Sequence, residues 1–135
     1  MSDSPTVVRR IGVLGTLVWD TLVLDTRVRD TPNRDSRVRA HEDRQSWGGI
    51  AFSIEALHAA LPAAWRIVPL IRLGRDLEPQ ARAWLATIPR LDLDLGLRVV
   101  DQPNNRVELR YTSASERVER LSGGVSGWPA GELAE

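Results

Sequence analysis

Short apolar runs alternate with helix-like spacings along most of this chain. The runs at 11–14 and 67–73 are almost continuous, which predicts two buried strands of the kind found in parallel sheets. Pro69 is a local departure in the second run, because a proline cannot donate a hydrogen bond to a neighbouring strand. A third short strand is expected at 97–100.

Apolar residues three to four positions apart predict two helices between these strands. The first helix opens at Trp47-Gly48-Gly49 and is stopped by Pro62. Its buried face comprises Ala51, Ile54, Leu57 and Leu61. The second helix follows a turn in which Asp76 is placed to cap it, and Pro79 fits its first turn. Its apolar stripe comprises Ala81, Trp84, Leu85 and Ile88.

Two further segments have patterns of their own. Residues 17–24 stay apolar apart from Asp20, whereas 26–46 are polar and heavily charged. A segment of that kind is a surface loop or a two-stranded flap, and both alternatives remain open. Residues 106–111 and 117–121 alternate apolar and polar positions, which predicts a hairpin.

The predicted elements run strand, charged flap, helix, strand, helix, strand and hairpin, which is typical of an α/β fold with a largely parallel sheet. Residues 130–135 follow Trp128-Pro129 with helix-start signals, but the chain ends about one turn later. A sheet with so few parallel strands also leaves an open edge. We therefore expect a truncated domain, with a small complete domain and a frayed tail as the alternative.

Composition and charge exclude several function classes. The 18 basic residues balance 18 acidic ones, whereas proteins that bind nucleic-acid phosphates usually have a basic excess. Every basic residue is arginine and cysteine is absent, which excludes a Walker-type phosphate loop, Schiff-base lysines, thiolate catalysis and disulfides. No apolar run approaches the roughly 18 to 20 residues of a membrane span, and the N-terminus lacks a signal-peptide core. We expect a soluble cytoplasmic protein that binds neither nucleic acid nor membrane.

Few residues could carry chemistry. Asp20 follows the first predicted strand, and ligands of open α/β sheets bind at the carboxyl ends of the strands. Its carboxylate could accept hydrogen bonds from two sugar hydroxyls, and a turn-capping aspartate is an equal alternative. Gly48-Gly49 would let backbone N–H groups approach a ligand, or would simply form a turn. No Ser–His–Asp arrangement or carboxylate pair is compelling.

The succession of these motifs resembles the ribokinase-like (PfkB) family of carbohydrate kinases. Ile11-Gly12-Val13-Leu14-Gly15 followed by Asp20 is similar to the family's first strand and substrate-binding aspartate. Trp47-Gly48-Gly49-Ile50-Ala51-Phe52-Ser53 is similar to its glycine-pair signature, with Ser53 where the family usually has Asn. Residues 68–76 resemble the strand and Gly-x-Asp turn that follow, and residues 103–109 lie where the family has substrate-facing strands.

This resemblance implies that residues 1–135 are the N-terminal part of one ribokinase-like domain: part of a Rossmann-type parallel sheet with a small β-sheet lid. The lid strands are expected within 21–46 and 97–121. The implied substrate-binding residues are Asp20, Gly48, Gly49, Ser53, Asn105 and Arg106, and Asn104 is a further hypothesis for substrate contact.

The family uses ATP and Mg²⁺, together with a catalytic aspartate in a late Gly-x-Gly-Asp motif. This sequence lacks that motif, so we expect no catalytic residue, no metal site and no ATP binding in this chain alone. Two functions stay open. The first is the substrate-binding half of an ATP-dependent sugar or nucleoside kinase. The second is a non-catalytic binding or assembly module that dimerises through the lid strands.

Overall fold

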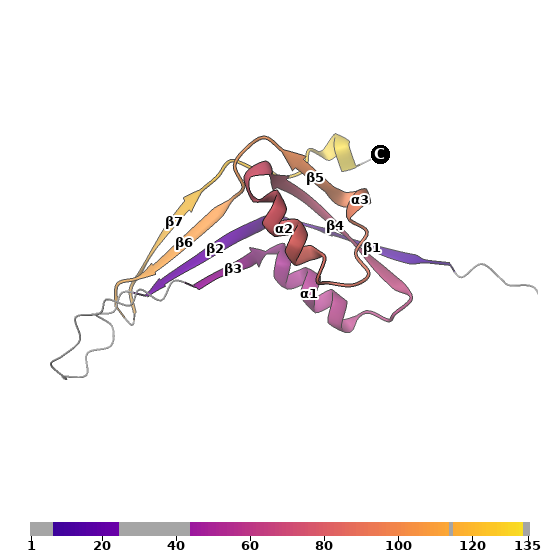
Figure 1. Cartoon of the computed structure of the whole chain (residues 1–135), viewed down its shortest axis with the longest axis horizontal. Coiled ribbons are helices and arrows are strands. Elements are labelled where there is room, and N and C mark those ends of the chain that lie inside the picture. The colour runs from indigo at the N-terminus through magenta and orange to yellow at the C-terminus, as the bar shows by residue number, and fades with distance from the viewer. Residues whose placement is uncertain (1–6, 25–43, 114, 134–135) are drawn as a thin grey trace, which may run out of the picture.

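Two β-sheets and the helices packed against them make up the protein (Figure 1). The computed structural model describes residues 7–24, 44–113 and 115–133. The first sheet is parallel, with the order β1-β4-β5, and its strands are β1 (Arg9–Leu14), β4 (Trp65–Gly74) and β5 (Leu97–Val100). The second has the order β3-β2-β6-β7, and its strands are β3 (Arg44–Gly49), β2 (Leu17–Leu24), β6 (Arg106–Tyr111) and β7 (Arg117–Ser122). In this four-stranded sheet β2 and β6 are parallel, and the outer strands pair antiparallel to them.

The core lies between the parallel sheet and two helices, α1 (Ile50–Ala60) and α2 (Glu78–Leu85). Side chains from both helices join one buried cluster with residues of β2, β4 and β5. Its members are Leu17, Ile50, Ala51, Ile54, Ile71, Leu73, Ala81, Leu85 and Leu97. Burying one large aliphatic side chain of this kind contributes about 1.5–3 kcal/mol, so this cluster determines where the helices lie on the sheet.

The opposite face of the parallel sheet contacts the segment that follows β7. Arg72 donates hydrogen bonds to Ser126 Oγ (2.8 Å) and to the Gly127 carbonyl (2.9 Å). The Arg98 guanidinium lies 5.9 Å from the centre of the Trp128 ring, within cation–π range. One-turn helices complete the fold: α3 (Leu93–Gly96) and two 3₁₀ turns, Arg75–Leu77 and Ala130–Leu133.

Several local predictions are confirmed. The helix α1 ends before Pro62, and Pro79 lies in the first turn of α2, where its missing N–H costs no helical hydrogen bond. The predicted hairpin is β6–β7. Pro69 is accommodated in β4 because it pairs only with Val13 of β1, and β5 begins to pair with β4 at Ile71, so this proline has a strand neighbour on one side only.

Other local predictions were wrong. The strand β1 is not buried: it lies at a sheet edge, and the Leu14 side chain is 56% exposed. Trp47 and Gly48 do not belong to the first helix, because they pair with β2 as part of β3, and the helix begins after them with Gly49 as its N-cap. The α2 helix ends at Leu85, although Ile88 still packs against the core.

The predicted lid boundaries also change. Residues 97–100 form β5, which pairs with β4 and so belongs to the parallel sheet, not to the lid. The four-stranded sheet begins at Leu17, earlier than expected, and continues through β6 and β7. Residues 25–43, where most of the charged flap was predicted, lie outside the described residues.

Candidate functional site

Asp20 lies in the middle of β2, with Ser46 of β3 opposite it on one side and Val107 of β6 on the other. Its carboxylate extends over the backbone of Gly48. A Cβ added at Gly48 would lie 1.9 Å from Asp20 Oδ2 and 2.7 Å from its Cγ. Only glycine leaves room for the carboxylate there, so the structure brings Asp20 and Gly48 together as one unit.

Burial, and to a smaller extent the negative charge of Glu119 on β7, raise the pKa of Asp20. Within the part of the chain that the structure describes, no group donates a hydrogen bond to this carboxylate. Partly buried carboxylates ordinarily have donors, since an unpartnered one loses hydration without compensation. Among the described residues, the Asp20 carboxylate therefore keeps unused capacity to accept hydrogen bonds.

Gly49 makes the turn from β3 into α1. Its φ of 64° lies in the left-handed region, and a Cβ there would be 2.3 Å from the Thr16 carbonyl oxygen. That carbonyl instead accepts a hydrogen bond from Ile50 N at 3.0 Å, at the start of the helix. Ser53 follows within the first turn of α1 and is exposed, so its hydroxyl is accessible to a ligand.

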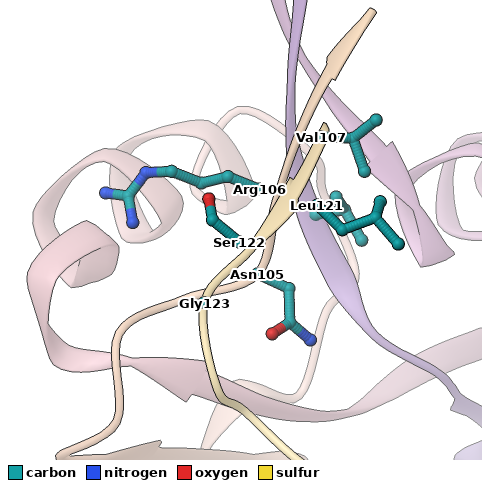
Figure 2. A pocket seen from close by; sticks show the side chains of 7 residues that line it. Asn105, Arg106, Val107, Leu121, Ser122 and Gly123 are labelled. Carbon is teal, nitrogen blue, oxygen red and sulfur yellow. The ribbon is translucent and has the colours of Figure 1, made fainter. Parts of the chain in front are cut away.

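A hollow of about 360 Å³ opens beside β2, β6 and β7 (Figure 2). Its lining residues are Val18, Asn105, Arg106, Val107, Leu121, Ser122 and Gly123. Val18 is two residues from Asp20, and Val107 is the strand partner of Asp20, so both share its face of the sheet. Figure 2 shows Val107 and Leu121 on one side of the strands, with Arg106 and Ser122 on the other. Asp20 itself does not line the hollow, but Val18 and its strand neighbour Val107 do, so the hollow lies next to Asp20 on the same face of the sheet.

The Asn105 and Arg106 side chains both have partners within the protein. The Asn105 amide exchanges two hydrogen bonds with the Val125 backbone, donating at 2.9 Å and accepting at 3.1 Å. The Arg106 guanidinium forms an ion pair with Asp76 at 2.7 Å. It projects from the sheet face opposite to that of Val107, so the structure does not bring Arg106 together with Asp20.

The role predicted for Asp76 was wrong. No side chain caps α2, and Asp76 instead accepts a hydrogen bond from the Asn104 N–H at 2.8 Å and pairs with Arg106. Burial alone would raise the pKa of Asp76, but the Asn104 N–H and the Arg106 guanidinium outweigh it and lower this pKa.

No protein-family model and no curated protein sequence matches this chain. Solved structures do. The nucleoside kinase of Methanocaldococcus jannaschii, an archaeal member of the ribokinase family, matches with a TM-score of 0.59 at 12% identity, over 84% of this chain and 36% of that chain. The ribokinase of Cryptococcus neoformans, solved with ADP, matches with a TM-score of 0.56 at 16% identity, over 84% of this chain and 34% of that chain. This is the ribokinase-like fold.

The predicted fold class is therefore confirmed, for part of that fold. A third match, the ligand-free nucleoside kinase of Burkholderia thailandensis, has a TM-score of 0.54 at 17% identity, over 85% of this chain and 39% of that chain. This chain spans little more than a third of the length of these kinases. At such identities the likeness establishes the fold, and the site has to be argued from its own geometry.

A second hollow of about 510 Å³ lies at the other end of the ribokinase-like sheet. Asp92 there pairs with Arg10 at 2.8 Å and with Arg66, near the starts of β1 and β4. The hydrogen bond from Arg10, and to a smaller extent the hydrogen bond from Arg66 and the charges of both arginines, lower the pKa of Asp92 despite its burial. Ligands of open α/β sheets bind at the carboxyl ends of the strands, which favours the Asp20 hollow over this one.

Within residues 7–24, 44–113 and 115–133, no three acidic or histidine side chains lie close enough to hold a metal ion. No helix there combines the length and apolar character needed to cross a membrane.

Proposed function

We propose that this chain is the substrate-binding portion of an ATP-dependent kinase that phosphorylates a hydroxyl group of a sugar or nucleoside. One observation carries the proposal: the Asp20 carboxylate has no donor among the described residues, lies against Gly48 and adjoins an apolar hollow. Two oxygens of one carboxylate can accept hydrogen bonds from two neighbouring hydroxyls, while the apolar wall contacts a ring. The ribokinase-like fold supports this reading, because its solved examples include nucleoside kinases and ribokinases.

In this proposal the four residues Asp20, Gly48, Gly49 and Ser53 bind and orient the substrate. The Asn105 and Arg106 side chains contribute through the geometry they hold, since each already has an internal partner. The four-stranded sheet covers the substrate and excludes water from the transferring phosphoryl group.

ATP and Mg²⁺ are not assigned to the described residues. The described residues contain no acidic cluster for Mg²⁺, and the sequence contains no Gly-x-Gly-Asp motif. The chemistry of phosphoryl transfer therefore requires groups other than these, and the role proposed for this chain is to hold the hydroxyl substrate. Because the reaction consumes ATP, we place it in the cytoplasm.

The test is calorimetric titration with ribose, fructose, adenosine and inosine, in the wild-type chain and in the Asp20→Asn variant. Asp20→Asn removes a charged acceptor and should weaken the best ligand about tenfold or more, since hydrogen bonds to charged groups contribute about 1.5–3 kcal/mol. The matched control is Asp101→Asn, because the Asp101 side chain is 89% exposed and pairs only with Arg75 at the surface. Affinity that is equal in Asp20→Asn and wild type would remove Asp20 from the site.

A second candidate function is an assembly module that dimerises through the four-stranded sheet. The observation in its favour is β7, an edge strand exposed along its whole length, with Val118 55% and Leu121 70% exposed. Sedimentation equilibrium distinguishes the two proposals. The assembly module would be favoured if the wild-type chain forms a stable dimer and binds no sugar or nucleoside, and if the Leu121→Asp variant loses the dimer.

A further inference from the structure

Asn104 lies where the two sheets meet. It is the one fully buried polar side chain among the described residues, with 0% exposure. Its Oδ1 accepts a hydrogen bond from Gly74 N at 3.0 Å, and its Nδ2 donates to the carbonyls of Leu17 (3.0 Å) and Asn105 (3.1 Å). Gly74 ends β4, Leu17 begins β2 and Asn105 precedes β6. One amide group therefore links three strand ends that belong to different sheets.

Two glycines allow the backbone to close around Asn104. A Cβ at Gly74 would lie 2.2 Å from Asn104 N, and a Cβ at Gly123 would lie 2.3 Å from the Asn104 carbonyl oxygen. Gly123 also has a φ of 99°, which disfavours any residue with a side chain. The backbone at both glycines therefore approaches Asn104 more closely than a residue with a side chain could.

An ion pair adds a second link at the same junction. Asp76 Oδ1 accepts the Asn104 N–H at 2.8 Å, and Asp76 Oδ2 pairs with Arg106 at 2.7 Å. Asp76 belongs to the turn after β4, whereas Arg106 begins β6. Both links thus run from the end of the parallel sheet to the start of the four-stranded sheet.

The junction is close in sequence to the candidate site. The Leu17 carbonyl accepts a hydrogen bond from Asn104 Nδ2, and Leu17 is three residues before Asp20 in the same strand. In addition, Trp19 N donates a hydrogen bond to the Asn105 carbonyl at 3.0 Å. A rotation of the four-stranded sheet about this junction would therefore move Asp20 relative to the parallel sheet and its helices.

We propose that Asn104, assisted by the Asp76–Arg106 pair, is a positioning residue that sets the angle between the two sheets and thereby holds Asp20 in front of the substrate. The inference rests on the proposed function only in assigning a substrate to Asp20; the geometric part stands by itself.

Three tryptophans supply a readout of this angle that needs no substrate. Trp19 and Trp47 lie in the four-stranded sheet with ring centres 4.7 Å apart, and Trp47 lies 6.1 Å from Trp84 of α2. The Trp47–Trp84 pair spans the four-stranded sheet and the helical layer. Exciton coupling between two indoles depends on their distance and angle, so the circular dichroism couplet of this pair reports how the sheet is oriented. The Trp84→Phe variant identifies the contribution of this pair.

The experiment compares Arg106→Gln, Arg106→Lys and Asn104→Asp in the full chain. Arg106→Gln breaks the pair with Asp76, whereas Arg106→Lys keeps a positive charge beside it. Asn104→Asp keeps the acceptor for Gly74 N but removes both Nδ2 donors. The matched control is Arg75→Gln, which breaks an ion pair between two exposed side chains, Arg75 (65% exposed) and Asp101 (89%). The probe ligands are adenosine and ribose.

We expect Arg106→Gln and Asn104→Asp to lose the Trp47–Trp84 part of the couplet and to bind the better probe at least about tenfold more weakly, because a misplaced binding group loses most of its benefit. Arg106→Lys and Arg75→Gln should keep the Trp47–Trp84 couplet and the affinity of the wild-type chain for the probe. A folded Arg106→Gln protein with an unchanged couplet overturns the proposal, and so does an altered couplet with unchanged affinity. If Asn104→Asp does not fold, the comparison of Arg106→Gln with Arg106→Lys tests the proposal by itself. If the wild-type chain binds neither probe, the proposed function fails, while the couplet still tests whether the junction sets the angle.

Discussion

The close approach of Asp20 to Gly48 predicts a strong effect of the smallest possible substitution, Gly48→Ala. The added methyl carbon would lie 1.9 Å from Asp20 Oδ2 and 2.7 Å from its Cγ, distances at which the carboxylate cannot stay in place. Asp20 has a short side chain in the middle of a paired strand, so it has to leave its rotamer or the two strands have to separate. Overpacking of this kind costs about 1–3 kcal/mol. Removal of a glycine from the unfolded chain offsets about 0.4–1 kcal/mol of that cost. The middle of both ranges leaves a net destabilisation of about 1.3 kcal/mol.

Urea denaturation followed by tryptophan fluorescence measures this destabilisation, and calorimetry measures the accompanying loss of sugar or nucleoside binding. Gly127→Ala is the matched control, because a Cβ at that position meets no atom within 4 Å. In an Asp20→Ala background, Gly48→Ala should stabilise the fold by about 0.4–1 kcal/mol, since the overlapping carboxylate is gone and only the effect on the unfolded chain remains. The double-mutant cycle should therefore show a coupling equal to the overpacking cost of about 1–3 kcal/mol between the two positions. Equal stability of Gly48→Ala and wild type, or zero coupling in the cycle, would refute the placement of the Asp20 carboxylate over Gly48.

Three further predictions test the core, the junction and the charges. Leu85→Ala empties a core position that is 1% exposed, and thermal or urea unfolding should show a loss of about 2–5 kcal/mol; a loss below 1 kcal/mol would contradict the assigned packing. Gly74→Ala should disturb the whole junction, because its Cβ would overlap the Asn104 backbone; amide hydrogen exchange should then speed up in β2 and β6, and unaltered protection there would count against the junction. Asp92 has a folded-state pKa below its unfolded value of 3.8, so its pairing with Arg10 and Arg66 stabilises the fold above pH 3.8 and that contribution is lost as the pH falls through the lower folded pKa. Unfolding midpoints measured from pH 7 to pH 2 should fall less steeply in Asp92→Asn than in wild type, and identical slopes would contradict this ion-pair assignment.

The pattern of apolar residues was sufficient to predict the order of most elements. The strands at 67–73 and 97–100, both helices and the hairpin all correspond to observed elements, and the prolines at 62 and 79 lie at helix ends as predicted. These features depend on local physics: a proline restricts its own backbone and that of its neighbour, and an apolar stripe at helical spacing has to be buried by some surface.

The candidate site was predicted less completely. Asp20 and the glycine pair were recognised from their order, and the structure adds the reason why Gly48 is glycine. The sequence suggests Asn104 as a substrate contact, but its amide is buried and fully hydrogen-bonded between the two sheets. The one available signal was a polar pair, Asn104-Asn105, directly before a predicted strand, and that signal does not say which asparagine faces inward.

The sequence by itself determined the α/β class, the element order and the presence of a carboxylate after the first strand, because each follows from residues close together in the chain. Only the tertiary structure decided which sheet each strand joins, that β1 has an exposed edge, and that Asp76 pairs with Arg106 across the junction instead of capping α2. These properties depend on partners far away in the sequence: Asp76 and Arg106, for example, are 30 residues apart. The same apolar run is compatible with a central or an edge strand, and the same aspartate can cap a helix or form an ion pair. The packing of the two sheets decides between these alternatives, because it determines which partners lie within reach.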